Sequence, residues 1–376
     1  MRHKTLSSLV CLILAAALLL ASSALDRTTP GASAAPLLQD VPRLDGVRIY
    51  FSESNGAASR FDRGPGGLSR FAGLLRLLGA DLHTLEWHRV IPPDADLVVI
   101  AGPTQDLSAE QVARLWLYLS DGGRVLLLAN PVALGSRAFD WRSGLFRLLV
   151  DDLGVRGRPD VVVTEGTREV PVFPPPATPG EPTATPAAPQ EVFALITDFL
   201  AEHRNTTHPI TADLAGPFAF FGARSIEIAP QLPAGVTVSP LLFSFGNYFG
   251  ERAFAQYERT GVAEYHPTGD TQRDRLPLAA AVSDSRSGLR LVLVGDREFA
   301  TNGGGLQTSP AYSQGYLYPD NARFLLNAVG WLLETDAAPA PLEFATPAPP
   351  GSPTPLPSPT PTPIPPTPTP TGESSA

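Results

Sequence analysis

Two acidic residues, Asp296 and Glu298, lie two positions apart directly after an apolar run that ends at Val294. A pair of carboxyl groups can serve as general acid and general base, or can bind a metal ion that activates water, if both face the same space. In an extended strand the two side chains would share a face, whereas a turn at Gly295 would break that geometry. Because the sequence identifies no base, metal ligand or nucleophile nearby, we favour a structural hypothesis: Asp296 braces the turn through backbone donors, and Arg297 and Glu298 are solvated or paired.

Small and polar residues also follow other apolar runs. Gly102 and Pro103 could bind an anion through backbone donors, although a tight turn into the next helix explains the same residues. A glycine-rich loop, residues 302–320, lacks the Lys and Ser/Thr pair of a phosphate-binding loop, but its length makes it a candidate rim for a site. The candidate ligand-binding residues are therefore Gly102, Pro103, Asn130, Asp296, Glu298, Asn302, Tyr312 and Tyr316.

The histidines do not follow a metal-binding pattern. His83 and His88 are five positions apart, and His203 and His208 flank a predicted helix end, so neither pair has the spacing of a helical zinc site. His208 stands in a His-Pro-Ile-Thr sequence, where we expect its ring to hydrogen-bond the backbone at a turn. We predict no metal site and no cofactor.

Aromatic residues gather between positions 243 and 249, at Phe243, Phe245, Tyr248 and Phe249. Beside glycines they could form a ledge for a carbohydrate or peptide, but aromatic side chains of an α/β protein more often fill the core. We expect core packing here.

These residues would be positioned by alternating strands and helices. Apolar runs predict strands at residues 47–51, 97–101, 125–129, 225–228, 236–243, 278–282 and 289–294. Helical spacing predicts helices over residues 66–79, 191–203 and 320–333, together with one that begins after an N-cap at Ser108 and ends at Gly122 and Gly123. The βαβ order favours a parallel sheet with right-handed crossovers.

Both ends of the chain differ in composition from this middle part. Arg2, His3 and Lys4 precede a short apolar run, which predicts an export signal or an N-terminal anchor over residues 1–34. The only cysteine, Cys11, lies inside that run, so a mature chain could hold no disulfide and no thiolate nucleophile. Prolines concentrate in an insertion at residues 171–189 and in a tail at residues 335–376, which we expect to be solvated and disordered.

The formal net charge of −9 argues against nucleic acid as a partner. We expect an exported protein, either secreted or tethered to the membrane through its N-terminal segment, whose folded part spans residues 43–334 as one domain.

Four stretches carry a resemblance to a known family when they are taken in order: residues 94–131, 208–211, 276–303 and 321–333. Together they resemble the extracytoplasmic domain of the gliding-motility-type ABC-transport auxiliary family, which is related to other uncharacterised domains. The resemblance implies a single α/β domain with a mostly parallel, doubly wound sheet of the class I glutamine-amidotransferase-like type. It also implies an accessory or binding role beside an ABC transporter or another envelope protein. The Pro/Thr-rich tail, which no second membrane helix follows, departs from the family.

Active amidotransferase-like domains carry a nucleophile on a tight turn between strand and helix. Asn130 and Pro131 occupy the corresponding turn here, Ser136 lies too far beyond it, and no Gly-x-Ser-x-Gly stretch occurs. We therefore predict a protein without catalytic residues that binds an unknown small ligand or a partner. The alternative is a divergent envelope hydrolase that uses Asp296 and Glu298 with a metal or activated water.

Overall fold

The computed structural model describes residues 41–131, 143–167, 195–198, 201–273, 275–308, 315–335 and 337–338. The expected signal segment, the proline-rich insertion and nearly all of the tail lie outside these residues. The chain divides into two compact units, Met1–Leu342 and Glu343–Ala376, and every described residue belongs to the first.

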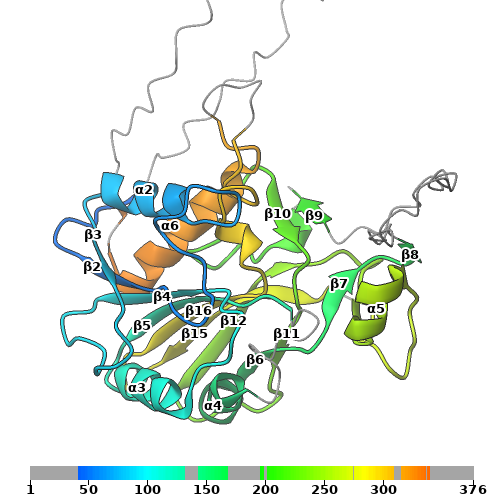
Figure 1. The fold of residues 1–376 in the computed structure, drawn as a ribbon, viewed down its shortest axis with the longest axis horizontal. Helices are drawn as coiled ribbons and strands as arrows, with labels where there is room; N and C mark the ends of the chain where they lie inside the picture. Colours follow the sequence, from blue (N-terminus) through cyan, green and yellow to red (C-terminus); the bar gives the residue numbers. More distant parts are fainter. Residues whose placement is uncertain are drawn as a thin grey trace, which may run out of the picture. The chain divides into compact units, whose positions relative to one another are not determined.

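One seven-stranded sheet organises the described part of the chain (Figure 1). Its strands lie in the order β12 (Val236–Phe243), β15 (Pro277–Asp284), β16 (Arg290–Val294), β5 (Arg124–Leu128), β4 (Leu97–Ala101), β2 (Arg48–Ser52) and β3 (Asp81–Thr84). The five strands from β16 to β3 are parallel, and β15 pairs antiparallel with both β16 and β12. The fold is therefore a mixed α/β domain with a mostly parallel central sheet, as expected.

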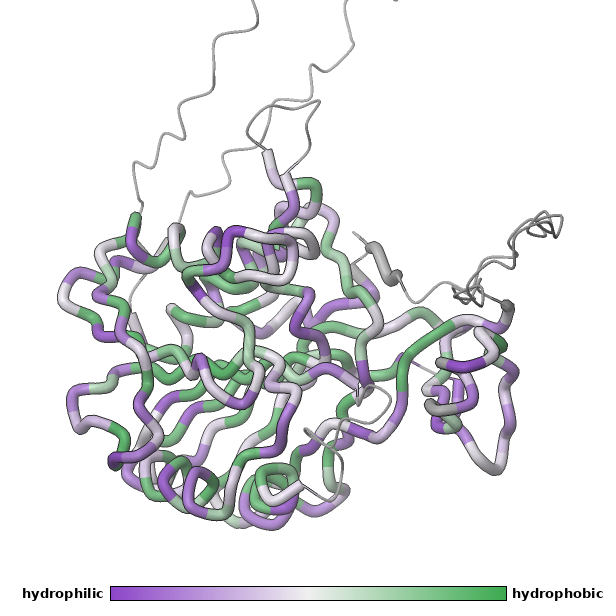
Figure 2. The backbone as a smooth tube through the Cα atoms, viewed as in Figure 1, coloured by the Kyte–Doolittle hydropathy of each residue, from purple (hydrophilic) through white to green (hydrophobic). Residues whose placement is uncertain are grey.

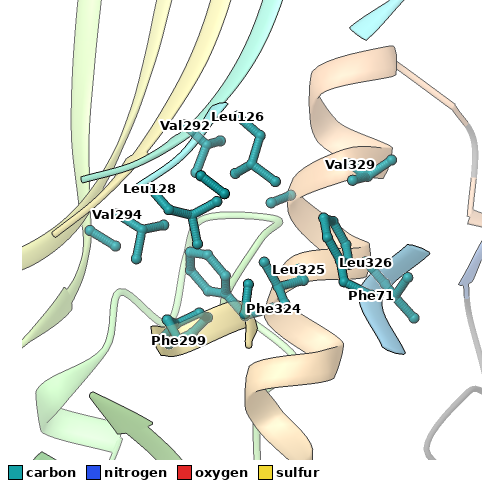
Figure 3. Packing of buried hydrophobic residues seen from close by; sticks show 14 of the residues in the cluster. Phe71, Leu126, Leu128, Val292, Val294, Phe299, Phe324, Leu325, Leu326 and Val329 are labelled. Carbon is teal, nitrogen blue, oxygen red and sulfur yellow. The ribbon is translucent and has the colours of Figure 1, made fainter. Parts of the chain in front are cut away.

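Helices cover both faces of this sheet. Successive residues of a strand point to opposite faces, so these apolar strands present apolar side chains on both faces, and the helices bury them. The helices are α2 (Ser69–Leu77) and α6 (Pro319–Leu333) on one face, with α3 (Ala109–Ser120) and α4 (Gly144–Leu153) on the other. Leu126 and Leu128 pack into the core beneath α2 and α6 (Figure 3), whereas Leu127 belongs to the core beneath α3 and α4. In Figure 2 the outer helices alternate between hydrophilic and hydrophobic colours, as helices packed along one face do.

Helix boundaries follow the expected local chemistry. Ser108 is the N-cap of α3 and forms a capping box with Gln111, as predicted. Gly122 has a φ of 85°, the left-handed conformation that lets the chain leave the helix toward β5. Among the described residues, no helix is both long enough and apolar enough to span a bilayer.

The prediction of a helix over residues 191–203 is wrong. Leu195–Asp198 forms strand β9, which pairs antiparallel with β10 (Phe218–Phe221), and only Ala201–His203 is helical, as the 3-10 turn η1. Local apolar spacing suggested a helix, but pairing with a distant strand determines the conformation.

A small lobe, hereafter the α5 lobe, lies beside the main sheet (Figure 1). It comprises β7 (Val161–Val163), β8 (Gly166–Thr167), β13 (Phe249–Glu251), helix α5 (Phe254–Thr260) and β14 (Val262–Ala263). Val161, Val163, Phe249, Tyr257 and Ala263 form its own core. The short strands β6 (Val155–Gly157) and β11 (Ile226–Ile228) pair nearby. Two-residue strands β1 (Val41–Pro42) and β17 (Ala337–Ala338) pair elsewhere in the domain.

Candidate functional site

The carboxyl ends of the parallel strands define the edge of the sheet where open α/β proteins place their sites. Strands β3 and β4, the next two in the chain after β2, lie on opposite sides of β2 in the sheet. The direction in which successive strands are placed therefore reverses at β2. We call the residues that follow β2, β4, β5 and β16 at this end the carboxyl edge.

Asp296 holds the turn after β16 at this edge. Its side chain is completely buried, and its two carboxyl oxygens accept from different backbone donors: Oδ1 from Glu298 N at 2.8 Å and Oδ2 from Phe221 N at 2.6 Å. The residue therefore joins the turn to strand β10. This is the bracing that the sequence favoured.

Arg297 and Glu298 are paired with each other and with Asn130. Both Nε and Nη2 of Arg297 donate to Oε1 of Glu298, at 3.1 and 2.5 Å. The amide of Asn130 donates to Oε2 of Glu298 at 2.5 Å, and its oxygen accepts from the backbone N of Arg297. About a quarter of each charged side chain is exposed, with values of 23% for Arg297 and 27% for Glu298. The edge thus presents a fixed, partly exposed pair of opposite charges.

The two carboxyl groups have opposite pKa shifts. Burial, followed by the charge of Glu298, raises the pKa of Asp296 well above its ordinary value. Burial alone would also raise the pKa of Glu298, but Arg297, Asp296 and Asn130 together lower it. Of the two carboxyl groups, Glu298 is therefore the more readily ionised.

Gly102 is required at the end of β4 because Arg297 lies against it. Its φ is 56°, and a Cβ added there would lie 2.6 Å from Cβ and 2.3 Å from Cδ of Arg297. Pro103 is buried beside it. Gly102 therefore allows the close approach of Arg297.

A second ion pair at this edge, which is buried, was not anticipated from the sequence. Nη1 of Arg60 lies 3.1 Å from Oε2 of Glu53, and the two side chains are only 6% and 13% exposed. Glu53 also accepts from the hydroxyl groups of Ser59 and Thr84, each at 3.1 Å. The available signal was the polar run that starts at Glu53, directly after strand β2, but the spacing of seven residues to Arg60 follows no recognisable pattern.

The remaining candidates lie further along the chain. Asn302 is buried, and its Oδ1 accepts from Arg70 N at 2.9 Å, while its Nδ2 donates to Gly64 O at 2.8 Å and to Asp62 O at 3.0 Å. Tyr316 is half-buried against the core, and burial raises its pKa. Tyr312, like Ser136, lies outside the described residues.

His208 and the aromatic cluster have structural roles. Nδ1 of His208 accepts from Ile210 N at 3.2 Å, which is the backbone contact expected at this turn. Tyr248 and Phe249 are buried, at 5% and 0% exposure, as core packing requires. Within the described part of the chain, no group of three or more His, Cys, Asp and Glu side chains could hold a metal ion.

The described residues at the carboxyl edge are largely engaged with one another and with the backbone. Asn130 occupies the turn after β5, and each oxygen of Asp296 already accepts from the backbone. Glu298 remains the only partly exposed carboxylate of the pair.

Comparisons with known proteins give one family match and several distant structural likenesses. No curated protein matches the sequence at a significant level. The N-terminal domain of mmIFT52 is 14% identical, covers 77% of this chain and 99% of its own, and superposes with a TM-score of 0.45. A ThuA-like protein from Bacteroides uniformis ATCC 8492 is 12% identical over 79% of this chain and 94% of its own, with a TM-score of 0.39. The model of a family described as an ABC-type uncharacterized transport system matches residues 80–328, which include every strand of the main sheet except β2. The chain belongs to this ABC-type transport system auxiliary family.

Proposed function

We propose that this protein is an exported, non-catalytic accessory of an ABC-type transport system, which binds a ligand or partner protein at its carboxyl edge. Membership of the transport auxiliary family is the observation that carries the proposal. The proposal includes an extracytoplasmic location and an amidotransferase-like variant of the α/β fold, both of which rest on the sequence.

The geometry of the edge supports binding. Arg297 and Glu298 are held by Asn130 and by contact with Gly102, so a ligand would meet charges whose positions are already fixed. Preorganised polar groups lose little conformational entropy when they bind. A carboxylate or amide of the partner could bind Arg297, and a donor could bind Glu298.

Affinity capture from the native envelope tests this role. The full chain, tagged at its C-terminus, serves as bait after chemical cross-linking, and recovered permease or ATPase subunits are quantified. We expect Glu298→Gln to lower the recovery about tenfold, the effect of losing one charge-assisted interaction.

Glu334→Gln is the matched control for this capture. Glu334 pairs with Arg290 and Arg124, the first residues of β16 and β5. This variant therefore removes ion pairs at the amino ends of the strands, remote from the carboxyl edge. Its recovery should equal that of the wild type. Failure to recover any transport component, or equal recovery with Glu298→Gln, would contradict the proposal.

A divergent hydrolase is the second candidate, and the opposite pKa shifts of Asp296 and Glu298 favour it. Two carboxyl groups whose pKa values are driven apart can divide the roles of acid and base. Melting temperatures of the purified protein with Mg²⁺, Mn²⁺, Ca²⁺ and Zn²⁺ distinguish the candidates. A rise that Glu298→Gln abolishes would support the hydrolase, whereas no shift would remove its metal-dependent form.

A further inference from the structure

The loop before helix α2, together with the helix itself, is basic in an otherwise acidic chain. Residues 60–78 hold one acidic residue, Asp62, and four arginines, Arg60, Arg63, Arg70 and Arg76. The formal net charge of the whole chain, by contrast, is −9. A concentration of basic residues on one helix and the loop beside it indicates a surface that meets a negatively charged partner.

Two of these arginines are used inside the fold, and two face solvent. Nη1 of Arg70 donates to two backbone carbonyls, at 2.6 and 2.7 Å, and Arg60 belongs to the buried pair with Glu53. Arg63 and Arg76 are exposed, and within the described ranges no salt bridge joins either of them to an acidic side chain. The charges of Arg63 and Arg76 can therefore bind a partner without breaking a contact of the fold.

Two exposed apolar side chains accompany these charges. Phe61 is 63% exposed and Leu77 is 52% exposed, so each would gain from burial. The guanidinium carbon of Arg60 lies 4.2 Å from the centroid of the Phe61 ring, a cation–π contact that holds the ring in place. Burial lowers the pKa of Arg60 and the charge of Arg76 lowers it further, so Arg76 lies near the same guanidinium group. Phe61 and Arg76 therefore occupy neighbouring parts of the surface.

The exposed side of α2 places Arg76 and Leu77 beside bare helix backbone. The residues of α2 that are buried in the core are Phe71, Ala72, Leu74 and Leu75. With about 3.6 residues per turn, Gly73, Arg76 and Leu77 lie on the opposite side. Gly73 is exposed, and a Cβ added there would have no neighbour within 4 Å. We call Phe61, Arg63, Gly73, Arg76 and Leu77 the basic face.

The N-terminal segment joins the fold beside this face. The backbone N of Leu44 donates to the carbonyl of Leu78, directly after α2, at 2.8 Å. Val41, where the described part of the chain begins, precedes Leu44 by three residues, so the two lie within about 11 Å of each other. The apolar run that predicts a membrane anchor belongs to the segment before Val41. A chain anchored through that segment would bring the end of α2 close to a bilayer.

We propose that the basic face docks on the membrane surface and binds the phosphate groups of anionic phospholipids, with Phe61 and Leu77 inserted at the level of the headgroups. Arginine pairs well with phosphate, and aromatic and aliphatic side chains on a basic surface partition into this boundary. A bilayer fits better than a partner protein, because the tether brings the end of α2 to the membrane in every assembly. The inference rests on the tethered form of the proposed function, but it uses no residue of the carboxyl edge.

Docking through the basic face would orient the whole domain. Helices α2 and α6 lie on one face of the main sheet, and α3 and α4 lie on the other (Figure 1). With α2 against the bilayer, α3 would point away from it. Probes on α2 and α3 should therefore differ in their distance from the lipid.

Lipid quenching of a fluorophore on each helix tests the proposal. The full chain is made by cell-free synthesis with vesicles present, so that the N-terminal segment is retained, and Cys11→Ser removes its only cysteine. Gly73→Cys on α2 or Ala113→Cys on α3, both at exposed positions, then carries the fluorophore. The vesicles contain a spin-labelled lipid as quencher, in phosphatidylcholine with or without phosphatidylglycerol. We expect quenching at Gly73→Cys to exceed that at Ala113→Cys about twofold or more, and only in vesicles that contain phosphatidylglycerol.

Arg76→Gln combined with Leu77→Ser should reduce this quenching in the Gly73→Cys chain. The ratio of docked to undocked chains should fall about tenfold, since the loss of one arginine alone lowers it about fivefold. Arg89→Gln combined with Val90→Ser is the matched control, because these exposed neighbours precede Ile91 of the core beneath α3 and α4. The control should be quenched like the parent chain.

Several results would overturn the proposal: equal quenching at the two label sites, equal quenching with and without phosphatidylglycerol, or no effect of the Arg76 and Leu77 substitutions. Shielding of Gly73→Cys in native membranes without quenching in vesicles would indicate a partner protein instead. Arg63→Gln replaces the double variant if circular dichroism shows that the latter does not fold. Flotation of the chain with the vesicles reports the tether separately, and the capture experiment depends on Glu298, so the docking can fail while the proposed function stands.

Discussion

At the scale of single residues, two neighbouring carboxyl groups differ because of their surroundings. Asp296 is buried and accepts from two backbone N–H groups, whereas Glu298 lies beside Arg297 and is partly exposed. The first organises the chain and the second supplies a charge. Their spacing would place them on one face of an extended strand, but the turn gives them different surroundings.

Replacing Asp296 should lower stability. Asp296→Ala leaves Phe221 N and Glu298 N without their acceptor in a buried setting, which should cost about 2–4 kcal/mol of unfolding free energy. Asp296→Asn keeps one acceptor and matches the protonated form that burial favours, so its cost should be about 1 kcal/mol. Urea denaturation measures both, and a folded Asp296→Ala of wild-type stability that had lost only ligand binding would refute the bracing role.

His208 should make the protein less stable in mild acid. Burial, then the charge of Arg290, lowers the pKa of His208 from 6.5 to about 4. The folded state therefore binds this proton less readily than the unfolded chain, so stability is complete above about pH 6.5 and declines as the pH falls toward 4. Because the ring is partly exposed, we expect a loss of only about 1–2 kcal/mol.

His208→Asn should remove this part of the pH dependence, because its amide oxygen can still accept from Ile210 N. Urea denaturation across the pH range compares the variant with the wild type. His88→Asn, at an exposed position, serves as control and should follow the wild-type curve. Parallel curves for the wild type and His208→Asn would show that His208 does not contribute.

At the scale of secondary structure, helix α2 begins with help from a distant loop. Leu68 occupies its N-cap position and offers no side-chain acceptor, so Asn302 accepts from Arg70 N instead. Asn302 also donates to the carbonyls of Asp62 and Gly64 in the loop that leads into the helix. One side chain thus fixes both the start of a helix and the approach to it.

Two substitutions at Asn302 separate these contributions. Asn302→Asp keeps the cap and loses the donors to Asp62 and Gly64, and it should destabilise the protein by about 1–2 kcal/mol. Asn302→Ala loses both and should cost about 2–3 kcal/mol. Denaturation midpoints measure the difference. Equal losses for the two variants would show that the cap does not contribute.

The sequence predicted the elements whose signals are local and missed those that depend on distant partners. The all-buried strand Leu97–Ala101 and the N-cap at Ser108 were both identifiable, because apolar runs and capping boxes are confined to a few residues. Strand β9 was mistaken for a helix, since its conformation depends on pairing with β10. At the site, the bracing by Asp296 could be inferred from Gly295 next to it. The Glu53–Arg60 pair could not, because it depends on the path of the loop and on Thr84, which only the fold brings to Glu53.

At the scale of the whole domain, one sheet separates two cores that cannot form independently. Leu126 and Leu127 are neighbours on β5, yet they belong to the cores on opposite faces. Each strand of the centre therefore contributes to both layers of helices. This arrangement should couple the two faces during unfolding.

Leu126→Ala and Leu127→Ala should each lower the unfolding free energy by about 2–5 kcal/mol. Both should shift a single transition. Trp87 belongs to the core beneath α3 and α4, and Trp331 packs against the core beneath α2 and α6. Two variants that keep only Trp87 or only Trp331, with the other three tryptophans replaced by Phe, therefore report on the two faces separately. Fluorescence transitions at different urea concentrations would contradict the coupling.

The position of β16 in the sheet also has a kinetic consequence. Strands β2, β3, β4 and β5 all come from the first part of the chain and pair with one another. The other neighbour of β5 is β16, which comes much later in the sequence and pairs with β5 from Arg290 opposite Arg124. Pairings so distant in sequence require the closure of a long loop, which is slow. We therefore expect a nascent chain to assemble the first four strands early and to join β16 late. Since Asn130 follows β5 and Glu298 follows β16, the hydrogen bond between them would form only after this last step, so that an incompletely folded chain would lack the ordered carboxyl edge.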